Sequence, residues 1–460
     1  MKKPSIFVVS LLLGLGLAIS GCQKQSSQNL WKSVNDPAIA TQLQSFVGEK
    51  AGQADAATNA AAPEFAGFFA AAKSGNWSAV DNDFKGMRNH AGQYQHNGAT
   101  DDLLRGTKWQ DVVEIWGAFD AFHRGDPKYS ALYANDIIAS IPPGSIYFGG
   151  TDPGRFVITA MQKSQVDADP FFTLTQNALA DGTYLDYLRG EYGNKIYIPT
   201  PEDSQNCFND YYTDVQQRMK AGKLDPGETA SVDPASGRVQ IGGHVAVMNI
   251  NALLVKKIFD ENSNRQFYVE ESFPLQWMYP YLEPNGLIFK LNNEPLTQLS
   301  DDTIQQDHDY WTKTVTPMIG NWLDDDTSVS DVAAFGEKVF LHHDFSGFAG
   351  DTNFVLNTYA QRMFSKERSS IAGLYAWRAK HTDNISEKDR MRRAADFAFR
   401  QSWALCPDSP EVVYAYVAFL MDENRRADAI LVTETAAKFP GMGKTTNRQL
   451  EVVIKQLKSQ

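Results

Sequence analysis

The spacing of apolar residues predicts a helical region between residues 63 and 140. Phe65, Phe68 and Ala72 recur at intervals of three and four residues, which places them on one face of a helix. The same spacing returns between residues 109 and 122, where Trp, Val, Ile and Phe are interspersed with polar side chains. We therefore expect amphipathic helices across this region.

Residues 22–62 have a different composition. Gln, Ser, Asn and Ala dominate this segment and aromatic side chains are few, so it offers little apolar surface to bury. We therefore expect a flexible tether here, with at most one weak helix inside it.

Residues 141–295 change to alternating short strands and helices. Apolar runs at 145–148 and 171–175 flank a helical segment, an arrangement of the size of a βαβ unit. Alternation of this kind predicts an α/β domain with a mostly parallel sheet and flanking helices. The other expected elements are a helix at 181–192, a loop at 221–240, a helix at 245–259, and strands at 266–269 and 287–291.

The pattern is helical from residue 296 to the end, with a connecting region at 296–385 and an internal repeat at 386–460. Ala395 and Ala429 hold equivalent positions 34 residues apart. That period, with small residues where two helices cross, is typical of tetratricopeptide repeats. We thus expect an all-α, tetratricopeptide-like C-terminal region; a coincidental amphipathic hairpin is the alternative. The other equivalent pairs are Phe399 and Thr433, Ser402 and Ala436, and Pro407 and Gly441.

Residues 1–21 have the composition of a secretory signal peptide. Lys2 and Lys3 precede an apolar stretch that runs from residue 6 to residue 19, and small residues follow it. The stretch is short for a permanent membrane span, which takes about 20 apolar residues. The sequence has no second stretch of that kind, so we expect the remainder of the chain to lie outside the bilayer.

The run Ala-Ile-Ser-Gly-Cys that ends at Cys22 resembles the lipobox of bacterial lipoproteins. The resemblance implies that the signal peptide is cut before Cys22 and that acyl chains on this cysteine hold the protein on a membrane. Gln23 and Lys24 are typical of lipoproteins sorted to the outer membrane, where the chain would face the periplasm; exposure on the cell surface stays open. The alternative is an ordinary signal peptide with an incidental cysteine.

Composition excludes several classes of protein. With 43% hydrophobic and 12% aromatic residues, the 460-residue chain is not mostly disordered and is long enough for two or three domains. Three cysteines exclude a disulfide scaffold and zinc sites of the CxxC type. The excess of 55 acidic over 43 basic residues argues against a nucleic-acid partner.

Polar residues near the ends of the expected strands form the candidate ligand site. The turn at 149–155 joins a strand to a helix, and its glycines allow backbone N–H groups to approach an anion. Paired carboxylates at the same edge of a parallel sheet bind cations or act as acid and base. The alternatives are a tight turn with a capping aspartate, and solvated loop charges. The candidate residues are Asp152, Arg155, Asn177, Asp181, Glu270 and Glu271.

Other signals for chemistry are weak. His342 and His343 are adjacent, so on a helix their side chains point in different directions and chelate a metal poorly. The sequence carries no recognised nucleophile or phosphate-binding motif. We therefore expect neither a metal nor a cofactor, and consider an enzyme less favoured than a binding protein.

Two stretches of the α/β region read DIIASIPPGSIYFGGTDPGRF over residues 136–156, and RQFYV followed by YLEPNGLIFKL within 265–291. In order and spacing they resemble the periplasmic C-terminal part of bacterial protein-O-mannosyltransferase-like membrane proteins, a domain of unknown function. The resemblance implies an α/β fold, a candidate ligand surface and association with a helical repeat domain. It implies no glycosyl transfer, because the membrane spans that carry this activity in the family have no counterpart here.

These features predict a membrane-anchored periplasmic lipoprotein that acts as a protein-interaction or assembly factor of the cell envelope. Repeat helices form concave binding surfaces, so an envelope protein is the expected partner of the C-terminal helices. The alternative is a glycan- or anion-binding module, or an envelope enzyme, related to glycosyltransferase accessory domains and acting at the strand ends.

Overall fold

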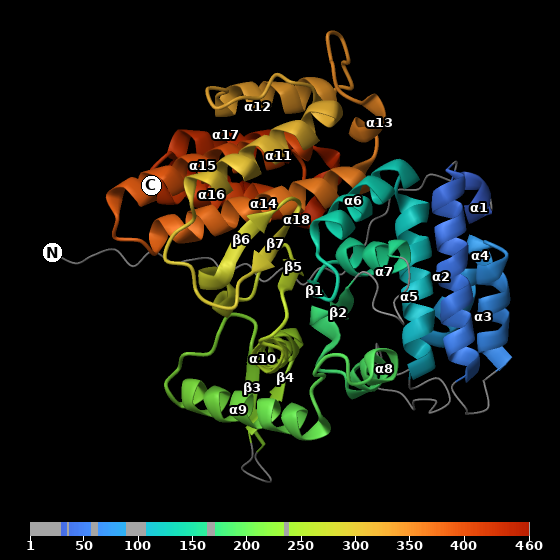
Figure 1. Cartoon of the computed structure of the whole chain (residues 1–460). Coiled ribbons are helices and arrows are strands. Elements are labelled where there is room, and N and C mark those ends of the chain that lie inside the picture. Colours follow the sequence, from blue (N-terminus) through green and yellow to red (C-terminus); the bar gives the residue numbers. More distant parts are fainter. Residues whose placement is uncertain are drawn as a thin grey trace.

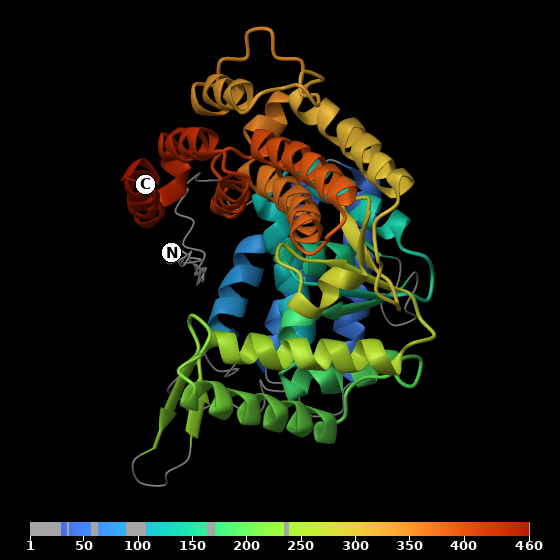
Figure 2. The same cartoon turned by 90° about the vertical axis from the view of Figure 1, so that its left-hand side faces the viewer.

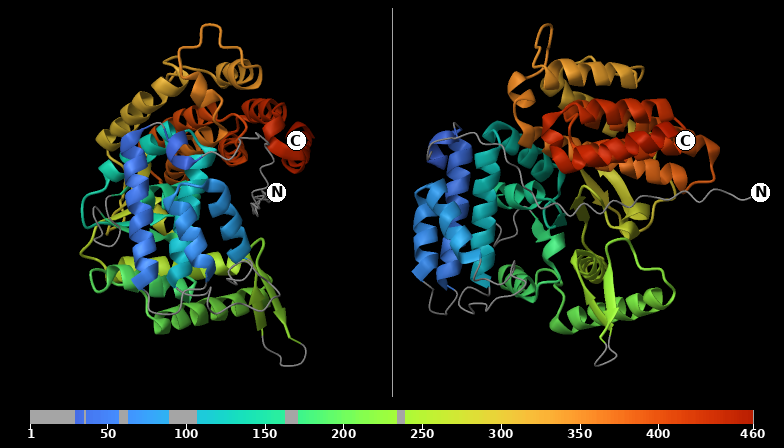
Figure 3. Two further views of the ribbon diagram at one scale, coloured as in Figure 1. Left: turned by 90° about the vertical axis from the view of Figure 1, so that its right-hand side faces the viewer. Right: turned by 180° about the vertical axis from the view of Figure 1, so that it is seen from behind.

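The computed structural model describes residues 29–34, 36–56, 63–88, 107–162, 171–233 and 239–459. The N-terminal helices lie side by side in a bundle, which Figure 3 shows from two directions. Apolar residues at helical spacing form its interior, as the sequence predicts, and Phe68, Val112 and Ile115 are fully buried there. The helices of the bundle are α1 (Leu30–Ser33), α2 (Pro37–Ala56), α3 (Pro63–Lys73), α4 (Trp77–Arg88) and α5 (Thr107–Arg124); α6 (Pro127–Ser140) follows α5 and leads to the sheet.

The prediction of a flexible tether over 22–62 is wrong for the part that α1 and α2 occupy. Apolar side chains of α2, such as Leu43 and Val47, are buried in the core of the molecule. The ammonium group of Lys50 is fully buried and pairs with Glu114 at 2.9 Å and with Glu191 at 2.6 Å. A weakly apolar helix is thus held by a buried ion pair, which leaves no signal in the hydrophobic pattern.

The central sheet is partly parallel. In the described residues it has five strands in the order β2-β1-β5-β7-β6, with β1 parallel to both β2 and β5. The β5–β7 and β7–β6 pairs are antiparallel, so the expectation of a mostly parallel sheet holds for one half only. The strands are β1 (Ile146–Gly149), β2 (Phe172–Thr175), β5 (Phe267–Glu270), β6 (Leu282–Asn285) and β7 (Ile288–Leu291).

The antiparallel half depends on a hairpin of which the sequence pattern predicts only the second strand, at 287–291. Gly286 connects β6 to β7 with a φ of +64°, a backbone conformation that glycine adopts without strain. Pro284 lies within β6, at the edge of the sheet, where a residue without an N–H group is tolerated. The hairpin turns the chain back beside β5 and reverses the strand direction.

The expected α/β architecture is confirmed, with helices and short helical turns around the sheet (Figure 1). Pro153–Val157 forms a π-helical turn that continues into α7, and Gln176–Ala178 forms a 3-10 turn after β2. Further helical turns lie at Gln276–Tyr281, Gly336–Leu341 and Pro440–Met442. The helices of this region are α7 (Ile158–Met161), α8 (Gly182–Tyr192), α9 (Pro201–Lys220) and α10 (His244–Glu261).

The segment 221–240, expected to be a loop, contributes instead to a small antiparallel hairpin. The hairpin consists of β3 (Thr229–Val232) and β4 (Val239–Gly242), and it projects beyond α9 and α10 (Figure 2). Its side chains are exposed or half-buried, and only Ala230 and Ile241 pack against a small apolar cluster on α9 and α10, so the apolar signal of the two strands is weak. The Gly, Asp, Pro and Ser content therefore masks the strands.

The C-terminal region consists of packed helix pairs, as expected. Helix α14 packs along α15, α16 packs on α17, and α18 follows against α17. Ala395 in α15 and Ala429 in α17 are fully buried, and Thr433 and Ala436 are buried as well. The helices are α11 (Asp301–Ile319), α12 (Val329–Phe335), α13 (Thr352–Val355), α14 (Thr358–Lys380), α15 (Ile385–Leu405), α16 (Pro410–Asp422), α17 (Arg426–Ala437) and α18 (Gly443–Ser459).

Helix α14 joins the C-terminal region to the sheet. It contacts both β7 and α6, and one continuous hydrophobic core reaches from Leu30 to Leu457. A buried ion pair of 2.7 Å between Arg368 on α14 and Asp307 on α11 holds these two helices together. The position of α14 also brings one of its carboxyl groups to the ends of the parallel strands.

Candidate functional site

The carboxylate of Glu270 occupies the turn that was predicted to receive an anion. Glu270 ends β5, and its side chain accepts hydrogen bonds from the backbone N–H groups of Gly150, at 3.1 Å, and Thr151, at 3.0 Å. The hydroxyl group of Thr151 donates a further hydrogen bond of 2.5 Å. A carboxyl group of the protein itself thus occupies the backbone N–H groups that were predicted to bind a ligand.

Two glycines make this approach sterically feasible. A Cβ atom at residue 154 would lie 1.5 Å from Oε2 of Glu270, and one at residue 150 would lie 2.0 Å from Oε2 of Glu271. The carbonyl group of Gly154 accepts a 2.7 Å hydrogen bond from the Tyr147 hydroxyl. The glycines of the turn are therefore required by the neighbouring carboxyl groups.

A third carboxyl group comes from α14. Glu367 forms a hydrogen bond with Glu270, and its Oε1 accepts a 2.9 Å hydrogen bond from the hydroxyl group of Tyr133. Burial, together with the charge of Glu270, raises the pKa of Glu367 well above its ordinary value. A hydrogen bond between two carboxyl groups needs a proton on one of them, and the raised pKa of Glu367 favours this residue as the donor.

Glu271, next along the chain, completes a carboxyl cluster with Glu270 and Glu367. Burial raises the pKa of Glu271 to about 8, and the charge of Glu270 acts in the same direction. The side-chain amide of Gln176 donates a 3.1 Å hydrogen bond to Glu271, and Ser370 donates one of 2.6 Å to its carbonyl group. The cluster therefore ties the turns after β1, β2 and β5 to α14.

Burial limits what the carboxyl cluster can do chemically. The exposed fractions are 0% for Glu270, 2% for Glu367 and 8% for Glu271. A proton-sharing carboxyl pair is the arrangement that acid–base catalysis uses, but these groups have almost no contact with solvent. Within the described ranges, no group of three His, Cys, Asp or Glu side chains is arranged to hold a metal ion.

The remaining candidate residues lie in separate environments. Asp152 is exposed and its side chain makes no capping hydrogen bond, whereas Asp181 caps α8 by accepting from Thr183 N at 2.9 Å. The guanidinium group of Arg155 lies 4.1 Å from the ring centroid of Phe156.

Asn177 belongs with the carboxyl cluster. Its side-chain amide donates a 2.9 Å hydrogen bond to the carbonyl group of Gly150 and also interacts with Glu271. The structure thus brings Asn177, Glu270 and Glu271 together, while Asp152, Arg155 and Asp181 do not join them. Sequence reasoning missed Glu367, whose position on a helix far along the chain leaves no local signal.

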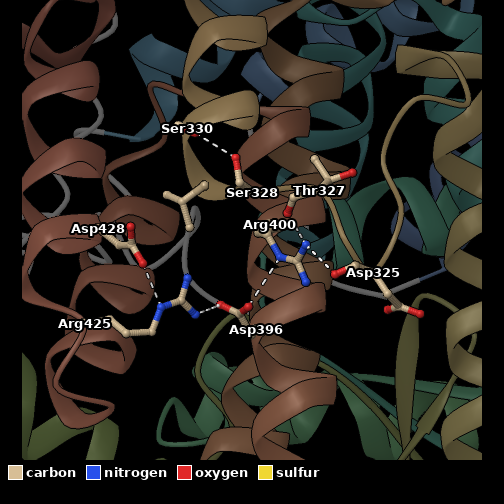
Figure 4. A pocket seen from close by; sticks show the side chains of 9 residues that line it. Asp325, Thr327, Ser328, Ser330, Asp396, Arg400, Arg425 and Asp428 are labelled. Atoms are coloured by element: carbon tan, nitrogen blue, oxygen red, sulfur yellow. Dashed lines mark hydrogen bonds and ion pairs between the residues drawn. The ribbon is translucent and has the colours of Figure 1, made fainter.

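A pocket of about 240 Å³ lies in the C-terminal region, between the start of α12 and the helices α15 and α17 (Figure 4). The residues that line it come from segments that are distant in sequence, so no local sequence motif predicts this pocket. The lining residues are Asp325, Thr327, Ser328, Val329, Ser330, Asp396, Arg400, Arg425 and Asp428.

Ion pairs hold the charged side chains of this pocket in place. Arg425 pairs with Asp396 at 2.6 Å and with Asp428 at 2.7 Å. Arg400 pairs with Asp396 at 3.5 Å and donates hydrogen bonds to the carbonyl groups of Asp325, at 3.0 Å, and Thr327. The pocket consequently presents both signs of charge on a preorganised surface.

The predicted signal peptide and Cys22 lie outside the described residues. In the part of the chain that the structure does describe, no helix is both long and apolar enough to cross a bilayer. Searches of protein-family models, of curated proteins and of solved structures found no match for this chain.

Proposed function

We propose that the chain is a lipid-anchored protein of the bacterial cell envelope that binds a partner protein through its C-terminal helices. The lipobox-like sequence ending at Cys22 supports the anchor. Attachment at the outer membrane, facing the periplasm, agrees with Gln23 and Lys24.

The charged pocket of Figure 4 is the observation that carries the binding role. Arg425 is about one-third exposed, so its guanidinium group remains available to a carboxylate from a partner. Asp428 is exposed to the same degree and offers an acceptor to a partner amine. We therefore favour a peptide segment that carries both charges over a simple anion.

The sealed carboxyl cluster favours this proposal over the alternative of a glycan-binding module or an envelope enzyme. A ligand at the strand ends would have to displace Glu270 from its hydrogen bonds with Gly150 and Thr151. Those bonds already satisfy the N–H groups that an anion or sugar would use. The C-terminal pocket, by contrast, is open to solvent and lined by polar atoms.

The binding role is tested by comparing the proteins that crosslink to the wild type and to an Arg425→Ala variant in envelope fractions. We expect the variant to lose a partner that the wild type retains, because the pocket loses its exposed cation. Arg393→Ala is the matched control, since Arg393 is exposed on α15 and does not line the pocket. Unchanged crosslinking in a folded Arg425→Ala protein would contradict the proposal.

The anchor is tested separately with Cys22→Ala. This change should release the chain from the membrane fraction or leave it unprocessed, since no cysteine remains for acylation at that position. If the variant stays with the membrane at its mature size, the chain is not a lipoprotein.

A further inference from the structure

The first residues that the structure describes are attached to the N-terminal bundle. Asn29 pairs with Asn76, and its side-chain amide donates a 2.8 Å hydrogen bond to the carbonyl group of Ser74. Leu30 N donates a 2.8 Å hydrogen bond to the carbonyl group of Gly75. The chain is thus fixed at the turn between α3 and α4, at the end of the bundle where α2 starts (Figure 1).

The distance from this point to the proposed lipid anchor is short. Six residues separate Cys22 from Asn29. Even a fully extended chain spans at most about 3.6 Å per residue, so Cys22 lies within about 25 Å of Asn29. Helix α2 has 20 residues and at 1.5 Å per residue is about 30 Å long. The anchor therefore cannot reach a bilayer placed at the opposite end of the bundle.

The surface at the attachment end has side chains suited to a lipid–water boundary. The indole rings of Trp31 and Trp77 are half-buried; Trp31 packs edge-on against Phe119 at 5.3 Å, and Trp77 stacks on His123 at 4.9 Å. Lys73, between the two indoles in sequence, is exposed. Indole rings and lysines gather at membrane interfaces because they combine apolar surface with a polar group.

We infer that this end of the bundle, formed by Asn29, Trp31, Lys73, Asn76, Trp77 and His123, rests on the phospholipid surface into which Cys22 is inserted. The inference depends on the lipid anchor of the proposed function and adds the orientation of the folded body. The short linker confines this end to the bilayer surface, and the indole rings contact the lipid.

The test uses the full-length, lipidated protein in vesicles of brominated phosphatidylethanolamine and phosphatidylglycerol. Bromine quenches tryptophan fluorescence at short range, and unbrominated vesicles give the reference. Replacing Trp31 and Trp77 together by Phe should reduce the quenching at least twofold. The matched control replaces Trp277 and Trp377, which are also half-buried but lie near the sheet and on α14.

Measuring the intact mass of the protein distinguishes failure of the proposed anchor from failure of the proposed orientation. A mature protein without acyl chains would refute the proposed anchor. An acylated protein whose quenching is unchanged by the double substitution, or falls equally in the control, would overturn the orientation alone. The single Trp77→Phe variant provides the same comparison if the loss of Trp31, which packs on Gly75, prevents folding.

Discussion

Gly154 lies so close to Glu270 that a Cβ atom on residue 154 would be 1.5 Å from Oε2 of the glutamate. The backbone turn between β1 and α7 is therefore wrapped around a carboxylate that arrives from β5. A turn whose geometry suits an external anion thus binds the Glu270 carboxyl group of the protein itself. The contact links the parallel half of the sheet to the proton-sharing pair of Glu270 and Glu367.

Gly154→Ala should lower the free energy of unfolding by about 1–3 kcal/mol or more, because the methyl group overlaps the Glu270 carboxylate. Gly190→Ala is the control: this helical position in α8 has no neighbouring atom within 4 Å of a new Cβ. It should leave stability unchanged or raise it by up to about 1 kcal/mol. Urea unfolding of the two variants measures the difference, and equal stabilities would contradict the close approach.

Stability should fall as pH rises from about 4.5 to about 8, because folded Glu271 keeps a proton that the unfolded chain releases in this range. One such proton contributes a slope of at most about 1.4 kcal/mol per pH unit. Glu271→Gln should flatten the slope and raise the stability near pH 8. The elevated pKa of Glu367 acts in the same direction.

The measurement for Glu271 is a series of urea unfolding curves at several pH values. Glu261→Gln, on an exposed position of α10, is the matched carboxamide control and should keep the wild-type slope. Parallel pH profiles for the wild type and Glu271→Gln would show that the Glu271 carboxyl is ionised in the folded protein throughout this range.

Lys50→Met should destabilise the protein by about 3–5 kcal/mol, since Glu114 and Glu191 would remain buried without their cation. Burial alone would lower the pKa of Lys50, but these carboxylates raise it above its ordinary value, so the lysine is charged in the folded protein. Lys85→Met, at a largely exposed i,i+4 pair, should cost less than about 1 kcal/mol. Similar thermal midpoints for the two variants would show that the Lys50 ion pair does not hold α2 in the folded protein.

Ala429→Leu should lower the free energy of unfolding by about 1–3 kcal/mol, because Ala429 is fully buried where α17 packs on its neighbours. Ala427 is exposed on the same helix, so Ala427→Leu is the matched control and should have little effect. Calorimetry of both variants gives the comparison. If the two melt together, the repeat position at 429 does not mark a close helix contact.

The local spacing of apolar residues predicts many of the helices and strands. The buried strands β1, β2 and β5 are short apolar runs, and α10 and the C-terminal helices repeat apolar side chains at helical spacing. Such patterns are visible in sequence because each element buries its own face regardless of which partner it meets. Ala395 and Ala429, the small residues 34 positions apart, are both fully buried, as close helix packing requires.

The sequence predicted part of the candidate site. Glu270, Glu271 and Asn177 were placed at one edge correctly, because parallel strands end on the same side. Whether that edge is open to a ligand is decided by tertiary contacts: Glu270 fills the turn, and α14 brings Glu367 to Glu270 from a distant part of the chain. The hairpin β3–β4 was not predicted for a different reason: its side chains are at most half-buried, so its apolar pattern is weak.

The sequence by itself determined the strand and helix segments with a buried face and the small residues of the C-terminal helices, and it predicts a lipid anchor at Cys22. Tertiary structure alone decided that α2 is folded, that β7 runs antiparallel to β5, and that the strand-end turn is filled by Glu270. The physical reason is how far apart along the sequence the interacting residues lie. Apolar burial repeats with the local geometry of each element, whereas buried charges such as Lys50 and Glu367 are matched by partners that only the folded chain brings together.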